Sequence, residues 1–255
     1  MTPSLPKIAL VTGAAKRLGR AIALELAAQG WDIVVHYGQS AADADATVSA
    51  ITQLGRRAVA LQCDLADEAA TRKLIPAAIA LLGAITCVVN SASLFDYDDA
   101  HSFSFDKLNA HMHANLGAPV LLAQALHART PADQQAVVIN LLDQKLINLN
   151  PDFLSYTLSK SALQTATTML AQALAPTVRV VGLAPGITMV SGEQTPGEFT
   201  NAHARTPLGK SSTPDDIAQA VCYLAQARAI TGTTLFVDGG QHLIPLQRDV
   251  MFVAK

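Results

Sequence analysis

Residues 8–20 read IALVTGAAKRLGR, a short apolar run followed by a glycine-containing turn and the start of a helical pattern. The run is typical of a strand that is covered on both faces. Gly13 and Gly19 allow the backbone to come close to a bound group, and the helix start offers free N–H groups and a partial positive charge. A strand, turn and helix in this order indicate a pyrophosphate site. The alternative is an ordinary strand-to-helix turn, because a glycine pair alone is a weak signal.

The rest of the chain alternates between short apolar runs and longer stretches of helical period. Strands are expected at 8–12, 32–36, 58–62, 87–90, 136–141, 178–183 and 234–237, and helices near 18–29, 41–54, 67–82, 106–129, 156–174 and 213–227. The pattern predicts an α/β fold: a single-domain, Rossmann-type, doubly wound parallel sheet of about seven strands, with helices on both faces. Residues 185–207 are the one long irregular stretch, and we expect a mobile lid there.

The composition describes one globular domain over residues 1–255, with half of the residues apolar and 15% charged. With 18 basic and 20 acidic residues, the chain has no electrostatic footprint for nucleic acid or an anionic membrane. Cys63, Cys87 and Cys222 are predicted to be buried free thiols, as in a reducing cytosol. No leader pattern and no membrane-spanning run is recognised, so we expect a cytoplasmic protein.

The end of the second expected strand bears on the choice of cofactor. A dinucleotide with a free ribose 2′-hydroxyl usually meets an acidic side chain there, whereas this chain has His36, Tyr37 and Ser40. Lys16 and Arg17 add positive charge in the preceding turn, and His36 and Ser40 are expected to donate hydrogen bonds to a 2′-phosphate. The sequence therefore favours NADP(H) over NAD(H). A solvated turn is the alternative explanation of the two cations.

Three side chains suited to proton transfer follow the fifth expected strand, namely Asp143, Tyr156 and Lys160. A spacing of four residues places Tyr156 and Lys160 on one helix face, with their β-carbons about 6 Å apart. A nearby ammonium lowers the pKa of a phenol from ~10 by about one to three units, which would suit proton exchange near neutral pH. An accidental pair on a surface helix is the alternative.

The ordered series of motifs resembles the short-chain dehydrogenase/reductase family over nearly the whole chain. The series comprises Thr12-Gly13, Asp64, Asn90 with Ala92, Asn115, Tyr156 with Lys160, Pro185-Gly186 with Thr188, and residues 237–240. The resemblance implies that Asp64 binds the adenine side, Asn115 orders a water relay, Lys160 holds the ribose and Tyr156 transfers the proton. The expected cofactor contacts are Gly13, Arg17, Leu18, His36, Tyr37, Ser40, Asp64, Leu65, Asn90, Ser91, Ala92, Lys160, Pro185, Gly186 and Thr188.

Two departures from the general family pattern are similar to pteridine reductases. Arg17 stands where the family has a middle glycine, and Asp143 stands where it has a serine thirteen residues before the tyrosine. Residues 14–20, His36-Tyr37 with Ser40, and Ser93 with Phe95 extend the likeness. One position breaks this pattern, because Ser91 replaces the usual second asparagine after the fourth strand.

Physical chemistry gives Asp143 a separate argument. An ionised carboxylate about 4 Å from a forming alkoxide opposes it by roughly 4 kcal/mol at an effective dielectric of 20, about a thousandfold in rate. Asp143 therefore fits protonation of a ring nitrogen better than reduction of a ketone. Phe95 is expected to stack on a flat heterocycle, and simple anchoring of its loop is the alternative.

The leading hypothesis is an NADPH-dependent reductase of pterins, from dihydropterin to tetrahydropterin, with folate as a larger substrate. Tyr156, coupled to Asp143 and Lys160, would supply the proton while hydride passes to a ring carbon. The expected substrate contacts are Arg17, Ser93, Phe95, Asp143 and Tyr156. One rival is a carbonyl reductase, for example of 3-oxoacyl thioesters, with Asp143 protonated. The other is a catalytically silent NADP-binding sensor, against which the retained Tyr156 argues.

No metal site is predicted, because His111 and His113 face different directions on their helix. The isolated histidines are His101, His127, His203 and His242. The tail 243–255 is too apolar for a free terminus and is expected to pack on its own domain or on a partner subunit. The family resemblance implies a homotetramer built on the helices that hold Asn115 and Tyr156.

Overall fold

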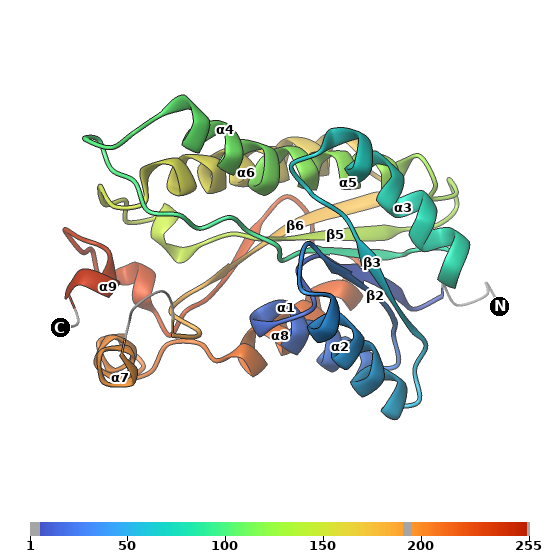
Figure 1. The fold of residues 1–255 in the computed structure, drawn as a ribbon, viewed down its shortest axis with the longest axis horizontal. Helices are drawn as coiled ribbons and strands as arrows, with labels where there is room; N and C mark the ends of the chain where they lie inside the picture. Colours follow the sequence, from blue (N-terminus) through green and yellow to red (C-terminus); the bar gives the residue numbers. More distant parts are fainter. Residues whose placement is uncertain (1–5, 191–194, 254–255) are drawn as a thin grey trace.

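A parallel sheet forms the centre of the computed structural model, which describes residues 6–190 and 195–253 (Figure 1). Within these ranges its strands are β1 Ile8–Val11, β2 Asp32–Tyr37, β3 Ala58–Gln62, β4 Cys87–Asn90, β5 Ala136–Leu141, β6 Val178–Pro185 and β7 Thr234–Val237. Their order is β3-β2-β1-β4-β5-β6-β7, and every neighbouring pair is parallel. The winding reverses between β1 and β4, and this confirms the predicted doubly wound sheet.

Helices cover both faces of the sheet because the strands are apolar on both faces. The helices are α1 Arg17–Ala28, α2 Ala41–Gln53 and α8 Pro214–Gln226 on one side, and α3 Glu68–Leu82, α4 Phe105–Met112, α5 Ala118–His127 and α6 Leu154–Ala173 on the other (Figure 1). Consecutive residues of β1 point to opposite layers: Val11 packs in the α1 layer and Leu10 in the α3 layer. The sheet is therefore buried on both sides, and its carboxyl ends remain available for chemistry.

The helix expected over 106–129 is interrupted. A π-helical segment, His113–Gly117, joins α4 to α5, and its bond from the Ala118 N–H to the His113 carbonyl spans five residues. Such widened turns are frequent at functional sites. Asn115 lies inside this segment. Hydrophobic periodicity does not reveal one extra residue in a turn, so the sequence predicted a continuous helix.

The stretch 185–207 is not irregular throughout, because it contains α7 Pro196–Ala204. Thr195 and Glu198 form a capping box and Pro196 occupies the first turn, which is a helix-start signal that the sequence analysis overlooked. Residues 191–194 of the expected lid lie outside the described residues.

The apolar tail packs on its own domain, where α9 Val250–Val253 lies beside α7 (Figure 1). Short 3₁₀ turns at Gln144–Leu146 and Gln241–Leu243 complete the described elements. Residues 254–255 of the tail fall outside the described part of the chain. The three cysteines are buried and free, as predicted. Among the described helices, none has the length and apolar character that crossing a membrane requires.

Candidate active site

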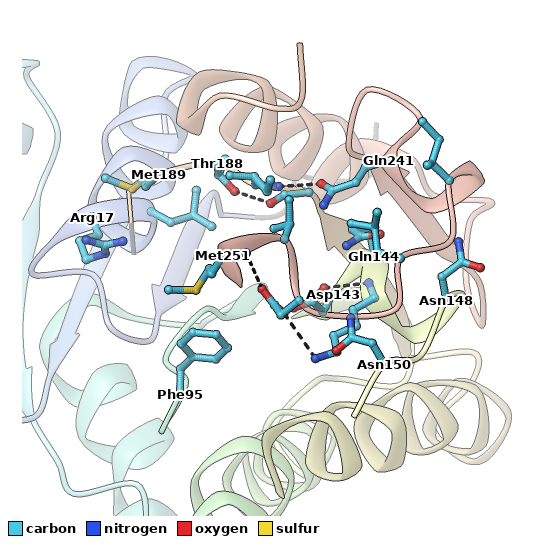
Figure 2. A pocket seen from close by; sticks show the side chains of 18 residues that line it. Arg17, Phe95, Asp143, Gln144, Asn148, Asn150, Thr188, Met189, Gln241 and Met251 are labelled. Atoms are coloured by element: carbon cyan, nitrogen blue, oxygen red, sulfur yellow. Dashed lines mark hydrogen bonds and ion pairs between the residues drawn. The ribbon is translucent and has the colours of Figure 1, made fainter. Parts of the chain in front are cut away.

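A cavity of about 260 Å³ opens at the carboxyl ends of the strands, where doubly wound sheets bind their ligands (Figure 2). Its walls come from the segments after β1, β4, β5 and β6 and from the C-terminal tail. The lining includes Arg17, Leu18, Phe95, Asp143, Lys145, Gly186, Thr188, Asp249 and Met251. The topology thus gathers predicted site residues that are far apart in the sequence.

Asp143, Tyr156 and Lys160 meet beside this cavity. The Tyr156 hydroxyl donates a hydrogen bond of 2.9 Å to Asp143 Oδ2, and the Lys145 backbone N–H donates one of 2.8 Å to Asp143 Oδ1. Lys160 Nζ donates to the Leu141 carbonyl at 2.7 Å and lies 5.8 Å from the centroid of the Tyr156 ring. The predicted proximity of the carboxyl, the phenol and the amine is confirmed.

Burial dominates the electrostatics of these three groups. It raises the pKa of the Asp143 carboxyl, against the opposing hydrogen bonds from Lys145 and Tyr156. Burial and the charge of Asp143 raise the pKa of Tyr156 well above its usual value, and burial lowers the pKa of Lys160 to about 8. The expected lowering of the phenol pKa is therefore wrong in this arrangement. The phenol faces a carboxyl group, whereas the amine bonds to a carbonyl.

Asp98 fixes the first turn of α6 and was missed by the sequence analysis. Its buried carboxylate accepts hydrogen bonds from the Ser155 backbone N–H at 2.8 Å and from the Ser155 hydroxyl. The N-cap residue Phe153 has a left-handed φ of 53° and no capping side chain, so Asp98 supplies the cap from another loop. This contact connects the loop after β4 to the helix that carries Tyr156. An acidic residue in a loop gives no sequence signal for such a distant cap.

Asn115 holds the same loop from the other side. Its Oδ1 accepts from the Leu94 N–H at 2.8 Å, while its Nδ2 donates to the Leu94 carbonyl at 2.9 Å and to the Ser159 hydroxyl at 3.0 Å. The Ser93 hydroxyl lies 3.3 Å from Asn115 Oδ1. Asn115 therefore ties the loop that carries Ser93 and Phe95 to α6. Its expected role in a water relay stays a prediction.

Phe95 connects the loop to the phenol. Its ring stands nearly perpendicular to that of Tyr156 at 4.6 Å and stacks on Phe153 at 4.3 Å. The side chain is 40% exposed and lines the cavity. The contact with Phe153 anchors the loop, and the exposed part is available to a flat ligand, so the geometry accommodates both explanations of Phe95.

The turn after β1 packs closely against α1 and the segment after β4, and this packing requires glycines. A Cβ on Gly19 would lie 2.3 Å from the Gly13 carbonyl oxygen, and one on Gly13 would lie 3.0 Å from Ala92 Cα. No side chain caps α1, and its first turn contains no acidic residue. The start of α1 therefore keeps the positive character that attracts a phosphate. These features fit a dinucleotide pyrophosphate.

His36 does not face a 2′-phosphate, which corrects the expected cofactor contact. The Gly13 N–H donates to His36 Nδ1 at 3.1 Å, so Nε2 carries the proton and donates to the Cys63 carbonyl at 3.1 Å. Burial lowers the pKa of the ring, which favours this neutral form. Both ring nitrogens of His36 form hydrogen bonds within the protein, and the bond from the Gly13 N–H holds the backbone of the glycine turn.

The other residues at this end of the sheet remain exposed or half-buried. Tyr37 ends β2, the Ser40 hydroxyl does not cap α2, and Asp64 and Leu65 follow β3 at the surface. Lys16 forms a 2.9 Å ion pair with the half-exposed Asp43. The charge expected from Lys16 is therefore partly balanced.

Local hydrogen bonds fix the segment after β4. The Ser91 and Ala92 N–H groups both donate to the Thr12 hydroxyl at 3.0 Å, and the buried Asn90 donates to Asn140 Oδ1 at 2.7 Å. The Asn90 side chain is thus engaged inside the sheet.

Pro185 ends β6, and the two residues expected after it shape the cavity wall. A Cβ on Gly186 would lie 2.3 Å from the Ser211 hydroxyl oxygen. The Thr188 hydroxyl donates to the Gly186 carbonyl at 2.9 Å. Only glycine fits at position 186, and Thr188 stabilises the turn that passes the cavity.

The profile of the family described as "Enoyl-(Acyl carrier protein) reductase" matches residues 13–242. An uncharacterized oxidoreductase of Methylorubrum extorquens is 34% identical over 242 residues, which cover 92% of this chain and 97% of that one. This chain belongs to the short-chain dehydrogenase/reductase family. The predicted family resemblance is confirmed.

Two further relatives of this short-chain dehydrogenase/reductase are named for different reactions. The FolM alternative dihydrofolate reductase 1 of Brucella canis, solved in complex with NADP, superimposes with a TM-score of 0.87. It is 38% identical, and the match covers 93% of this chain and 94% of that one. A 3beta-hydroxysteroid dehydrogenase 1 of Eggerthella lenta is 32% identical over 251 residues, covering 94% of this chain and 95% of that one.

Three charged residues near the reacting groups were also missed by sequence reasoning. Lys145, Asp152 and Asp249 interact with one another at the edge of the cavity, and Lys145 and Asp152 are buried. The apolar residues of the tail gave no sign of this charged contact. Asp249 shows that the tail also brings charge to the site of this reductase family member.

Proposed function

We propose that this protein is an NADPH-dependent reductase of dihydropterins that yields tetrahydropterins and accepts dihydrofolate as a larger substrate. The hydrogen bond from Tyr156 to the half-buried Asp143 carries this proposal. It couples the phenol to a group that stores a proton, which is what protonation of a ring nitrogen requires.

The glycine turn and the uncapped start of α1 would hold the pyrophosphate of NADP(H), and Lys160 would contact the ribose. Lys16 and Ser40 would lie on the 2′-phosphate side, where no acidic side chain ends β2. NADPH supplies a hydride to a ring carbon of the substrate. The NADP bound by the FolM protein of Brucella canis supports this choice of cofactor.

The protein's own residues then deliver the proton. Tyr156 would donate its hydroxyl proton to the ring nitrogen, and a protonated Asp143 would then donate its own proton to the phenolate oxygen across the same 2.9 Å contact, which reverses the direction of that hydrogen bond. The raised pKa of Asp143 favours the protonated carboxyl that this transfer needs. Phe95 and Arg17 line the cavity on the substrate side, where one offers a ring face and the other a positive charge.

A carbonyl-reducing enzyme is the second candidate, and the similarity to the 3beta-hydroxysteroid dehydrogenase favours it. In that case Asp143 must keep its proton throughout the reaction, because an ionised carboxylate would oppose a forming alkoxide. A silent NADP-binding sensor is less well supported, since a pure binder has no use for the Tyr156 phenol.

We also propose a cytoplasmic homotetramer assembled through α4, α5 and α6. Phe105 on α4 and Met169 on α6 are 76% and 63% exposed, which leaves apolar area for subunit contacts. Light scattering of the purified protein tests the assembly, and a monomer would contradict it.

The function is tested by following NADPH oxidation with a panel of dihydropterins, dihydrofolate, acetoacetyl thioesters and hydroxysteroid-type ketones. Turnover of dihydropterins, lost in Tyr156→Phe with NADPH affinity retained, is the expected result. Turnover of ketones or thioesters alone would select the carbonyl reductase. NADPH binding without turnover of any substrate would select the sensor.

A further inference from the structure

Charged groups seat the C-terminal segment 248–253, here called the tail wall, against the edge of the cavity. Arg248 donates from Nε and NH2 to both oxygens of the Asp152 carboxylate, at 2.8 Å to each. The Asp249 N–H donates to Asp152 Oδ2 at 2.7 Å, and the Lys145 ammonium lies 3.4 Å from Asp249 Oδ2. The tail therefore pairs one positive and one negative charge with the opposite charges of the loop after β5.

A row of aromatic rings also anchors the tail wall, and Arg248 and Lys145 lie over two of these rings, 5.0 Å from the Phe252 centroid and 5.6 Å from the Phe153 centroid. Phe252 stacks on Phe153 at 6.2 Å and meets the edge of Tyr97 at 5.8 Å. Phe153 in turn stacks on Phe95, whose ring contacts Tyr156. The tail wall is thus built onto the same rings that surround the proton donor.

Met251 is the residue that these two anchors place in the cavity. It lies between Asp249 and Phe252, and its N–H donates to Asp249 Oδ1 at 3.1 Å. In the view of Figure 2 its side chain lies among Arg17, Phe95 and Asp143, and all four residues line the cavity. A flexible thioether thus forms part of the wall of the cavity, on the same side as the proton-donor groups.

We propose that Met251, held in place by the tail wall, is the specificity-determining residue that limits the size of the substrate. The cavity of about 260 Å³ is smaller than the roughly 300–1,000 Å³ of sites for drug-sized ligands. Removal of the Met251 side chain beyond Cβ is therefore expected to enlarge the cavity beside Phe95 and Asp143. The inference rests on the proposed function only for the substrates with which it is measured.

The test compares kcat/KM for dihydrofolate with kcat/KM for a dihydropterin that carries a small substituent. Met251→Ala is expected to raise the ratio of the two at least tenfold, since a single misfitting methylene in an apolar pocket changes selectivity by about 10- to 200-fold. Phe252→Ala, which releases the tail wall from Phe153, is expected to raise the ratio in the same direction. Met251→Phe is expected to lower it.

Leu243→Ala is the matched control, because it removes the same number of heavy atoms from an exposed tail residue outside the cavity lining. Its ratio is expected to equal that of the wild type. An unchanged ratio in Met251→Ala, with NADPH affinity and melting temperature retained, overturns the role of Met251.

Absence of turnover with both pterins in every protein would reject the proposed function alone. The ratio is then measured between a large and a small ketone, and the same tenfold change in Met251→Ala is required. Equal ratios for the wild type and Met251→Ala on these ketones overturn the inference as well.

Discussion

Replacement of Asp143 by asparagine separates the two reductive chemistries, because it keeps the shape of the side chain and removes its titratable proton. A ketone oxygen that accepts the Tyr156 proton would lie about 2.7 Å from the phenol oxygen. The phenol oxygen itself lies 2.9 Å from Asp143 Oδ2. Together these distances place the developing negative charge about 4.5 Å from the carboxyl oxygen.

At this separation an ionised carboxylate opposes the charge by about 3.7 kcal/mol at an effective dielectric of about 20. At a pH that ionises Asp143, Asp143→Asn is therefore expected to increase ketone reduction by up to several hundredfold, whereas at a pH that keeps the carboxyl protonated no such increase is expected. Dihydropterin reduction is expected to fall by about 10² to 10⁴, the usual contribution of a positioned general acid. The two activities should thus move in opposite directions in one variant.

Steady-state NADPH oxidation with one dihydropterin and one ketone measures both effects, and NADPH fluorescence titration checks that the cofactor site is intact. Asp133→Asn provides the control, since Asp133 is an exposed carboxylate that precedes β5. Equal losses with both substrates, at unchanged NADPH affinity, would show that Asp143 only holds Tyr156 in place. Undiminished dihydropterin reduction would refute the reasoning directly.

Three further predictions concern the amine, the glycine turn and the cofactor. The pKa of the Lys160 amine is about 8 in the folded chain and ordinarily 10.5, so the unfolded chain binds more protons between these values and stability rises with pH. Relative to Lys160→Met, the wild-type free energy of unfolding should rise by about 3 kcal/mol across this window, as urea titrations would measure; a constant difference would contradict the buried ammonium. Gly19→Ala should weaken NADPH binding at least tenfold or unfold the protein, because its Cβ would lie 2.3 Å from the Gly13 carbonyl oxygen. A variant with wild-type NADPH affinity and melting temperature would contradict the role of the glycine turn in cofactor binding. Lys16→Ala should raise KM for NADPH by up to about fivefold and leave KM for NADH unchanged, because its ion pair with Asp43 is half-exposed and such pairs are weak; equal changes would remove Lys16 from the 2′-phosphate side.

The sequence predicted the sheet well because both-sided burial leaves a simple mark. The fourth and fifth expected strands have the observed bounds, since their apolar runs end at polar residues or turns. The meeting of Asp143 with Tyr156 could also be foreseen, because the carboxyl end of β5 and the start of α6 lie at the same edge of the sheet. Such features depend on local pattern and on topology alone.

Features that depend on the orientation of one side chain were less predictable. His36 has the composition of a phosphate ligand, yet the Gly13 N–H and the Cys63 carbonyl use both of its nitrogens. The Lys160 spacing was correct, but its ammonium bonds to the Leu141 carbonyl, and the phenol pKa moves upward instead of downward. Sequence spacing brings groups together without stating which partner each one chooses.

The charges around Asp143 explain why an aspartate at this position changes the chemistry of the site. Arg248 balances Asp152, Asp249 lies against Lys145, and Asp143 and Lys160 are the titratable groups on either side of Tyr156. Burial moves the pKa of both toward the neutral form, upward for the carboxyl and down to about 8 for the amine. Protonation of the Asp143 carboxyl is therefore easier than that of an exposed aspartate, and the 2.9 Å contact connects the carboxyl to the Tyr156 hydroxyl. A serine at position 143 would orient the phenol without storing a proton. In the proposed reaction the aspartate would add that store, and a substrate with a basic ring nitrogen would make use of it.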